Sequence, residues 1–525
     1  MKRRLAIALL LAALVFVLYR KVTRLWWTYD DAYTLHLVTT YALADSFANP
    51  AMWPQKLFTP LVTTAFEAQL VAFGLEPSRW YVVHLILLFA TALALYATLR
   101  LWFSIAASLT AAILFVTGVP MCALIAVLGG THYLQAILLG CLSTILFVRG
   151  RKYESSLLYL LAMLAKETVV PLVVLLAFLP NTKRRDLAPH AIAVGIYLLW
   201  RRAVIGTILG GYGWAIAPGE WPRLIASLPM KIVRNCAGAG LAAGIVLLLV
   251  TAIGGAIAAR RNIVLFLVAL ALAAGPILPV SKEMQRRYAL MPWLVWSIAF
   301  AAGTDRFGVR RPQSPLSGRE PQLALRRDKA ATAVAALQIL ACVAAIAANR
   351  QEWSHEFAKT QRMSDEARFF FHMPPDGLLR APTVPPAAMG ELAWLQSFAG
   401  RPTGASWFFD DYFLCTGRTN GKRMWEYVPS RRGVVEIKPP GCPAYRRDVP
   451  LTWRFRYRDG SLFWKLGPYP NGKYHVLLGD GLQAFDVPRE DAFRLPDIPG
   501  LTVRLRYDSP DGWTTYSRPI ELRFR

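Results

Sequence analysis

Charged residues are scarce in this chain, and acidic residues are the scarcer kind. Only 18% of its 525 residues are charged, with 33 acidic against 59 basic side chains, while 55% are hydrophobic and the mean hydropathy is +0.35. This composition excludes an ordinary water-soluble globular protein. The formal charge of +26 could indicate a nucleic-acid partner. However, much of the excess lies in short segments between hydrophobic runs, as the positive-inside rule predicts, so we expect a polytopic α-helical membrane protein and no nucleic acid.

Cysteine is also rare, and its spacing excludes a zinc site of the paired C-x-x-C kind. Four of the six cysteines fall in or near apolar segments and are expected to be small buried hydrophobic residues: Cys122, Cys141, Cys236 and Cys342. Cys415 and Cys442 stand in the polar C-terminal region. They could form a disulfide if that region faces an oxidising compartment, and the sequence leaves this open.

No small-residue cleavage site follows the first apolar run. The chain begins MKRR, continues with Leu5 to Leu18, and then carries Tyr19, Arg20 and Lys21. A secretory signal peptide would end in small residues, so we expect a retained first membrane helix with a cytoplasmic N-terminus.

Hydrophobic runs long enough to cross a bilayer recur through residues 1–348, the expected transmembrane core. About 11 crossings are predicted, over Leu5 to Leu18, Tyr81 to Thr98, Ile105 to Val119, Tyr133 to Val148, Leu157 to Leu179, Ala188 to Trp200, Cys236 to Ala259, Ile263 to Val280, Ala289 to Ala302 and Ala330 to Ala348. Lys166 and Glu167 interrupt one run, which therefore crosses twice or dips in and returns. An outer loop, 20–80, is expected to carry interfacial amphipathic helices, and a basic linker, 303–329, to lie in the cytoplasm.

The remainder has the character of a soluble, extracytoplasmic region. Residues 349–450 are expected to be a mixed connecting region, with a helix around HEFAKTQRMSDEARFF that ends at Pro374 and Pro375. Residues 451–525 alternate apolar and polar side chains, which predicts an antiparallel β-sandwich-like domain with hairpins at Asp459-Gly460 and Asn471-Gly472. Asp410 and Asp411 follow a predicted strand end and are expected to have a structural role.

The sequence WWTYDDAY, residues 26–33, places Asp30 and Asp31 beside an aromatic pair that suits a membrane interface. Carboxylates are costly near lipid, which makes these two candidates for a functional site. The alternative is a hydrated loop or a helix N-terminus, which favours acidic residues.

On the predicted topology, the unusual charges of the chain collect at the outer membrane boundary: Asp30, Asp31, His132, Lys166, Glu167, Arg201, Arg202, Lys282, Glu283, Arg286 and Arg287. Outer arginines depart from the positive-inside rule. They could hold the phosphate of a lipid-linked substrate while a carboxylate takes a proton from an attacking hydroxyl. The alternative for each is a headgroup contact or a snorkelling anchor. His132 in GGTHY could be a metal ligand, a proton carrier or a plain polar contact.

Four motifs together resemble the GT-C superfamily of membrane glycosyltransferases, which includes the protein O-mannosyltransferases and the aminoarabinose transferases that modify lipid A: WTYDDAY, AKETVVPL, LLWRRAVIGTILGGYG and RRYALMP. The resemblance covers about two thirds of the chain and lies in the order of the motifs, since each alone is short. It implies an enzyme that uses a polyprenyl-phosphate sugar, with Asp30 or Asp31 as the base. Lys166 and Glu167 take the hairpin role, and Arg287-Tyr288 the late-loop motif.

The predicted function is transfer of a sugar from a polyprenyl-phosphate donor to an extracytoplasmic hydroxyl of a glycan, lipid or protein, with inversion, in the cytoplasmic (inner) membrane. The donor phosphate is expected to meet Lys166, Arg201, Arg202, Arg286 and Arg287, with Glu167, His132 and Tyr288 in support. No cofactor is indicated with certainty, and a divalent metal stays open. The alternatives are a transporter or flippase for a lipid-linked anion, and a membrane anchor for a glycan- or protein-binding sandwich.

Overall fold

A computed structural model describes residues 2–522 apart from 54–55, 180–181, 209–220, 239–240, 262, 306–320, 382–385, 416–420, 439–446, 459–460, 479–482 and 495–500. The chain divides into two compact units. The first comprises Met1–Leu25, Leu37–Gly213 and Pro218–Lys359, and the second comprises Trp26–His36, Trp214–Ala217 and Thr360–Arg525.

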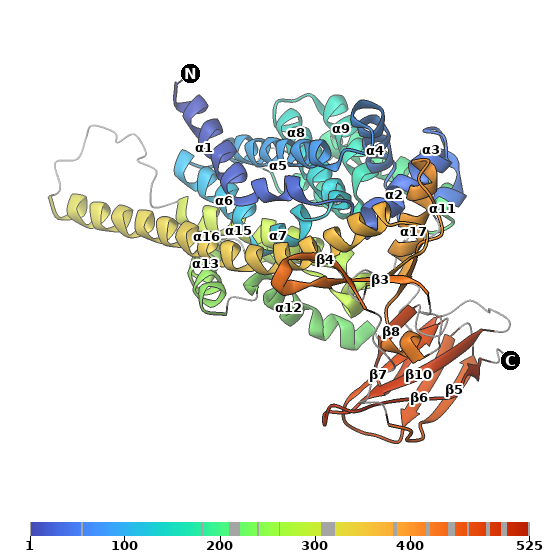
Figure 1. Cartoon of the computed structure of the whole chain (residues 1–525). Helices are drawn as coiled ribbons and strands as arrows, with labels where there is room; N and C mark the ends of the chain where they lie inside the picture. Colours follow the sequence, from blue (N-terminus) through green and yellow to red (C-terminus); the bar gives the residue numbers. More distant parts are fainter. Residues whose placement is uncertain are drawn as a thin grey trace. The chain divides into compact units, whose positions relative to one another are not determined.

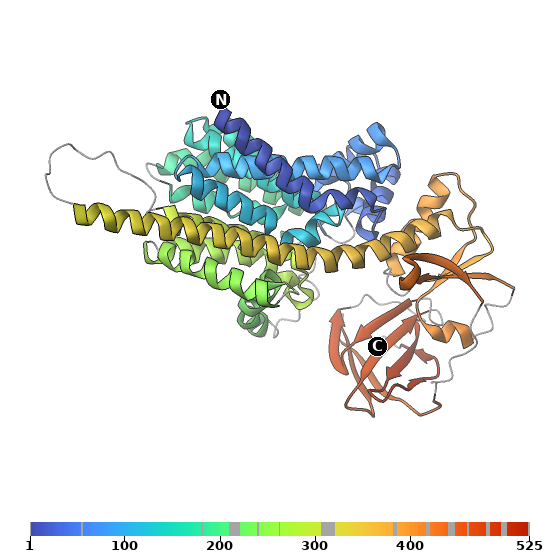
Figure 2. The ribbon, with the colours of Figure 1, turned by 60° about the vertical axis from the view of Figure 1, so that its left-hand side comes forward.

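The first unit is helical (Figures 1 and 2). Its α-helices are α1 (Lys2–Tyr19), α3 (Asp45–Ala48), α4 (Pro60–Phe73), α5 (Pro77–Leu99), α6 (Ile105–Thr117), α7 (Val119–Ile125), α8 (Thr131–Val148), α9 (Lys152–Ala165), α10 (Leu172–Ala177), α11 (Arg184–Ile205), α12 (Trp221–Ala237), α13 (Leu241–Arg261), α14 (Ile263–Ala274), α15 (Leu290–Asp305) and most of α16 (Pro321–His372). Each predicted crossing contains a described helix, although Cys236 to Ala259 includes residues 239–240, which are not described, and Ile263 to Val280 passes from α14 into a 3₁₀ helix, η7 (Gly275–Glu283). The predicted outer loop does contain short helices.

Six helices in the described residues are long and apolar enough to cross a membrane, and a seventh span is formed if α6 and α7, bent by 54°, count together. The prediction of a polytopic membrane protein is therefore confirmed. The other predicted crossings, α9, α10, α11 and α15, are shorter or carry more charge, so the number of about 11 stays a prediction.

The run from Leu157 to Leu179 is broken at the predicted place. Helix α9 ends at Ala165, Lys166 is extended (φ −158°, ψ 127°), and a 3₁₀ turn, η4 (Glu167–Val169), leads into α10. The Tyr159 hydroxyl of α9 donates to the Val170 carbonyl, so the chain turns back onto α9. Since the 6 residues of α10 rise only about 9 Å, this helix cannot cross alone, which favours the alternative that dips and returns.

Buried polar contacts join the helices of the first unit. The Trp293 indole of α15 donates to the Leu114 carbonyl of α6 at 2.8 Å, and the Tyr19 hydroxyl of α1 donates to the Val116 carbonyl at 2.8 Å. Asn349 of α16 donates in turn to the Tyr19 hydroxyl at 2.6 Å. Helix α16 continues without a break past Ala348, the predicted end of the core, to His372. Cys122, Cys141 and Cys236 are buried and Cys342 half-buried, as predicted for small apolar residues.

The second unit contains α2 (Tyr29–Thr40) up to His36, the end of α16, α17 (Pro386–Phe398) and three sheets. One sheet has the order β2 (Ser406–Phe408), β1 (Gly377–Arg380), β3 (Arg423–Val428) and β4 (Gly433–Ile437). Strands β2 and β3 pair with β1 in parallel, whereas β4 pairs with β3 antiparallel. Strand β2 ends beside Asp410, as expected. Of the two cysteines that could pair, Cys442 and the side chain of Cys415 lie outside the described residues.

The C-terminal strands form two antiparallel sheets, as predicted. β5 (Thr452–Arg458), β6 (Ser461–Gly467) and β9 (Glu490–Arg494) make one sheet; β11 (Thr514–Tyr516), β10 (Thr502–Asp508), β7 (Lys473–Leu478) and β8 (Gln483–Val487) make the other, where β12 (Ile520–Glu521) also pairs with β10. Leu462 and Leu466 of the first sheet share one buried core with Val503 and Leu505 of the second.

The two predicted hairpin turns have different outcomes. Asp459-Gly460 lies outside the described residues, and the strands on either side of it, β5 and β6, pair antiparallel through Arg458 and Ser461. Asn471-Gly472 was wrong as a hairpin, because β6 and β7 belong to different sheets. Gly472 does have a positive φ, +95°, and a Cβ there would lie 2.4 Å from the Asp508 carbonyl oxygen. The turn at Asn471-Gly472 therefore connects β6 of one sheet to β7 of the other.

Candidate functional site

The acidic pair begins helix α2. Thr28 precedes the helix, and its carbonyl accepts the first helical hydrogen bond, from Ala32 at 2.9 Å. The Asp31 Oδ2 atom accepts from the Thr28 backbone N–H at 3.0 Å and from the Thr28 hydroxyl at 2.7 Å. This is the acid's half of a capping box, in which a residue three positions into the helix reaches back to the cap. Asp31 is fully buried, whereas Asp30 is half-buried.

Other contacts within the second unit hold this helix start in place. The Trp26 N–H donates to the Ser364 hydroxyl at 2.5 Å, and the Trp26 ring packs on Phe371 with centroids 5.0 Å apart. Further along α2, the His36 Nδ1 atom lies 2.5 Å from Glu391 Oε2, and the ring stacks on Trp394. The sequence analysis missed His36, because its partners lie about 355 residues away and no local pattern connects them.

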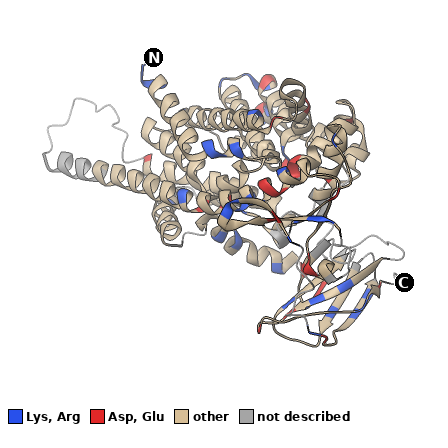
Figure 3. Cartoon of the chain, in the orientation of Figure 1, with Lys and Arg blue, Asp and Glu red and all other residues tan. Residues whose placement is uncertain are grey.

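In the first unit, where charged side chains are sparse (Figure 3), Lys166, Glu167 and Arg201 come together. The Lys166 Nζ atom is 3.3 Å from Glu167 Oε1, and the Arg201 Nη1 atom is 3.8 Å from Glu167 Oε2. Arg201 also donates to the Tyr197 hydroxyl at 2.8 Å and is only 2% exposed. Arg201 and Arg202 were expected in a loop, but α11 extends through Ile205, so both lie near its C-terminal end, with Arg202 in the last turn. Arg202 is exposed there.

His132 and Arg287 lie near the same cluster. The Lys166 Nζ atom is 5.3 Å from the centroid of the Tyr133 ring, which contacts the His132 ring at 4.6 Å. Both Lys166 and Arg287 are close enough to His132 to interact with it electrostatically. His132 was expected in a loop, but it lies in the first turn of α8, after the 3₁₀ turn η3 (Leu128–Gly130). Four segments far apart in sequence thus bring four predicted residues together: His132, Lys166, Arg201 and Arg287.

Arg286 differs from these cations because its charge is already neutralised. It forms an ion pair with Glu352 of α16, which is fully buried, and lies 3.7 Å from Glu356 of the same helix. Tyr288 follows in the 3₁₀ turn η8 (Arg286–Ala289), with the Arg287 guanidinium 5.6 Å from its ring. The side chains of Lys282 and Glu283 lie outside the described residues.

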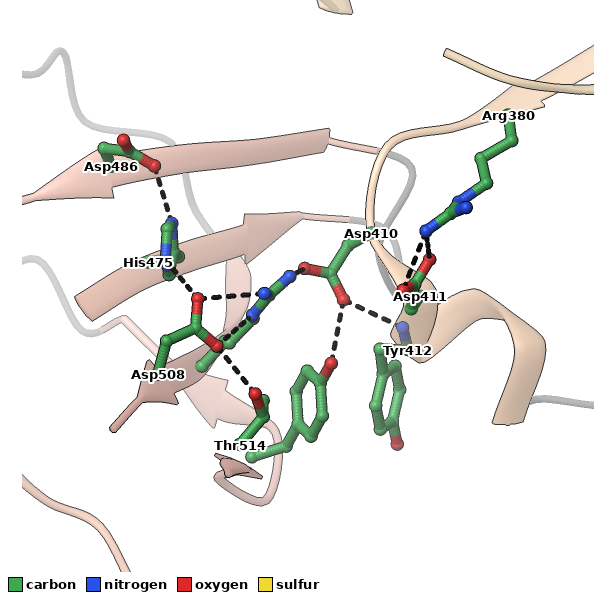
Figure 4. A network of polar contacts seen from close by, with 10 residues as sticks. Arg380, Asp410, Asp411, Tyr412, His475, Asp486, Asp508 and Thr514 are labelled. Carbon is green, nitrogen blue, oxygen red and sulfur yellow. Dashed lines mark hydrogen bonds and ion pairs between the residues drawn. The ribbon is translucent and has the colours of Figure 1, made fainter. Parts of the chain in front are cut away.

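A second polar cluster lies in the β region of the second unit (Figure 4). Buried Asp410 pairs with Arg506 of β10 and accepts from the Tyr516 hydroxyl at 3.2 Å. Arg506 donates from Nε and Nη2 to the two oxygens of Asp508, at 2.7 and 2.8 Å. His475 of β7 lies between Asp508, at 2.9 Å, and Asp486, at 2.6 Å. These contacts connect the end of β2 to β10 and β7, in line with the structural role expected for Asp410.

The pKa values of His475 and Asp508 are shifted by the contact between the two side chains. Burial opposes charge on His475, but the hydrogen bond and the negative charge of Asp508 raise the pKa of the imidazole above its usual value. Burial likewise opposes charge on Asp508, but the bonds from His475 and Arg506 lower the pKa of that carboxyl. Each partner therefore stabilises the charged form of the other.

No group of three or more His, Cys, Asp or Glu side chains suited to a metal ion occurs among the described residues. The use of a divalent metal ion, which the sequence analysis left open, therefore stays open.

Comparison with protein-family models finds no match, and neither does comparison with curated proteins. Among solved structures, the chain is similar to the crystal structure of the Archaeoglobus fulgidus oligosaccharyltransferase tethered through a disulfide bond to an acceptor peptide containing the NVT sequon. The two are 11% identical, with a TM-score of 0.46, over 77% of this chain and 64% of the archaeal chain. This chain therefore spans just under two thirds of that protein's length.

Proposed function

We propose that this membrane protein is a glycosyltransferase that moves a sugar from a polyprenyl-phosphate donor to a hydroxyl group of an extracytoplasmic acceptor. The observation that carries the proposal is the cluster of Lys166, Glu167 and Arg201 at the break between α9 and α10. Two cations share one carboxylate within a largely apolar unit, where unbalanced charge is costly. An anionic phosphate bound beside Lys166 and Arg201 would neutralise the positive charge that Glu167 leaves unbalanced.

Each member of the cluster has a role in this proposal. Arg201 and Lys166 bind the donor phosphate and stabilise the negative charge that develops on it as the glycosidic bond breaks. Glu167 holds the two cations in position before the donor arrives. Arg287 supplies further positive charge, and His132 and Tyr288 support it. Arg202 and Arg286 are weaker candidates, because the first is exposed and the second is paired with Glu352 and Glu356.

Asp30 is the proposed general base. Asp31 is buried and holds the Thr28 cap, which is a structural task, whereas Asp30 is the half-buried member of the pair. The acceptor hydroxyl attacks the anomeric carbon as the bond from that carbon to the phosphate oxygen breaks. The hydroxyl proton passes to Asp30, and polyprenyl phosphate leaves with the bonding electrons. In-line attack inverts the anomeric centre.

The partners follow from the same proposal. They are a polyprenyl-phosphate sugar, surrounding membrane lipids, and an acceptor that is a glycan, a lipid or a protein. We place the protein in the cytoplasmic membrane with its N-terminus inside and its C-terminal β region outside, because that orientation satisfies the distribution of basic loops.

The test uses the purified chain in proteoliposomes that contain donors labelled separately in the sugar and in the lipid. A glycosyltransferase separates the two labels and leaves free polyprenyl phosphate in the membrane. A transporter moves both labels together to the other leaflet. Movement of intact donor without separation of the labels, across a panel of sugars and with cell-envelope extract as acceptor, would overturn the proposal.

A further inference from the structure

We propose that a groove between α1 and α5 binds an anionic phospholipid, a site separate from that of the glycosyl donor. The groove encloses about 610 Å³ and lies wholly within the first unit. It is lined by the C-terminal half of α1, the following 3₁₀ turn η1 (Arg20–Arg24), and the first half of α5. Its volume falls in the range of small-ligand sites.

The charge of the groove is all of one sign. Arg20, Lys21 and Arg24 line it and are exposed, and no acidic side chain is among its lining residues within the described part of the chain. None of the three cations takes part in an ion pair among the described residues, in contrast with Arg286. Three unneutralised cations on one short turn attract a phosphate headgroup.

The other wall is apolar and uncovered. Phe16 of α1 is 58% exposed, and Val82 and Ile86 of α5 are 47% and 58% exposed. These side chains line the same groove as the cations. A ligand with a charged head and a hydrocarbon body would cover both parts.

The positions of the cations and of the apolar side chains along α1 match those of the headgroup and the acyl chains of a lipid in a bilayer. Helix α1 has Lys2, Arg3 and Arg4 at one end and the cations of η1 at the other, and its 18 residues rise about 27 Å. This is close to the hydrocarbon thickness of about 30 Å, so the two cationic ends fit the two headgroup layers. The apolar wall then faces the acyl chains of the leaflet into which Arg20, Lys21 and Arg24 project.

The occupant is assigned as a phospholipid rather than the polyprenyl donor because the proposed donor-binding residues do not line this groove. Lys166 and Arg201 belong to α9–η4 and α11, and neither is among the lining residues. Failure of the glycosyltransferase proposal would leave this site untouched.

The experiment is native mass spectrometry of the purified full-length chain titrated with phosphatidylglycerol or phosphatidylcholine. The wild type should bind phosphatidylglycerol more tightly, and the triple variant Arg20→Gln, Lys21→Gln, Arg24→Gln should lose at least about tenfold of that affinity. The control variant Lys2→Gln, Arg3→Gln, Arg4→Gln removes three cations from the other end of α1 and should keep the preference. A second variant, Ile86→Trp, fills the groove without changing charge and should also displace the lipid.

Equal binding of the two phospholipids by the wild type would overturn the proposal, as would an unchanged preference in both the triple variant and Ile86→Trp. Displacement of phosphatidylglycerol by equimolar polyprenyl phosphate, together with loss of donor turnover in the triple variant, would also overturn it by assigning the groove to the donor.

Discussion

The Thr28 hydroxyl donates a hydrogen bond of 2.7 Å to the Asp31 carboxylate, and this contact separates the roles of two adjacent acids. Asp31 is bound to the residue that caps α2, while Asp30 occupies the neighbouring, half-buried position. A sequence that offers two equivalent candidates for a base therefore folds into a helix start in which the buried acid, Asp31, binds Thr28. The proposal that Asp30 acts in catalysis depends on this role of Asp31 and on the greater exposure of Asp30.

Replacing Thr28 by alanine should destabilise the protein by about 1 kcal/mol, because Asp31 loses the hydrogen bond that the Thr28 hydroxyl donates to it at the buried start of α2. Removal of the Asp31 carboxylate should cost at least as much, since the Thr28 N–H and hydroxyl then lose their acceptor in a buried site. Thermal unfolding in detergent measures both. Asp30→Asn serves as the control and should unfold at the wild-type temperature; a larger loss in Asp30→Asn than in Asp31→Asn would contradict the assignment of the structural role.

Arg201→Gln should reduce donor turnover by about 100-fold or more, because Glu167 and the donor phosphate both lose a buried cationic partner. Arg202→Gln provides a matched control one residue further along α11, where the side chain is exposed. Steady-state kinetics with increasing donor concentration would show a higher KM in the first variant and nearly unchanged constants in the second. Equal effects of the two substitutions would exclude a specific role for the buried arginine.

The contact between β7 and β10 should weaken as the pH rises. The pKa of His475 is raised in the folded chain, so its contribution is complete below about pH 6.5, the unfolded value, and is lost as the pH rises through the higher folded value. The pKa of Asp508 is lowered, so its contribution is complete above about pH 3.9 and is lost only as the pH falls through the lower folded value. Stabilisation by this pair is therefore greatest between about pH 4 and 6.5.

Hydrogen–deuterium exchange of β7 and β10, corrected for the intrinsic rate, measures this change between pH 6 and pH 9. Protection should decline in the wild type, and the decline should be smaller in His475→Asn, which cannot titrate. An identical decline in both proteins would show that another group is responsible.

Gly118→Ala should destabilise the first unit strongly. A Cβ at this position would lie 2.1 Å from the Trp293 Nε1 atom, whose N–H bonds to the Leu114 carbonyl. Overpacking of this kind typically costs about 1–3 kcal/mol, and the indole hydrogen bond would be lost in addition. Gly195→Ala is the control, because a Cβ there has no atom within 4 Å among those that the structure describes. Comparable thermal midpoints for the two variants would refute the packing argument.

The fold could be predicted from sequence wherever a local pattern decides the structure. Apolar runs indicated the helices, the pair Lys166-Glu167 indicated the break after α9, and alternation indicated the strands of the C-terminal sheets. Asn471-Gly472 shows the limit of this reasoning. Gly472 does have a positive φ, as expected for a turn. However, whether the strands before and after the turn pair with each other depends on how eight strands divide between two sheets.

Less of the candidate site could be predicted from the sequence. The capping role of Asp31 could have been found, because Thr28 and Asp31 have the spacing of a capping box. The pairing of Arg286 with Glu352 could not, since 66 positions, including the whole of α15, separate the two residues. Nor did any local signal distinguish buried Arg201 from exposed Arg202; only the direction each side chain takes from α11 does so.

The most direct test of the central claim is release of polyprenyl phosphate from a panel of radiolabelled polyprenyl-phosphate sugars by the purified wild type, Asp30→Asn and Asp31→Asn. The account predicts release from at least one donor by the wild type, its loss by a factor of about 100 or more in Asp30→Asn, and substantial retained activity in Asp31→Asn once the protein is folded. Full activity in Asp30→Asn, or saturable binding of every donor without release by the wild type, would contradict it.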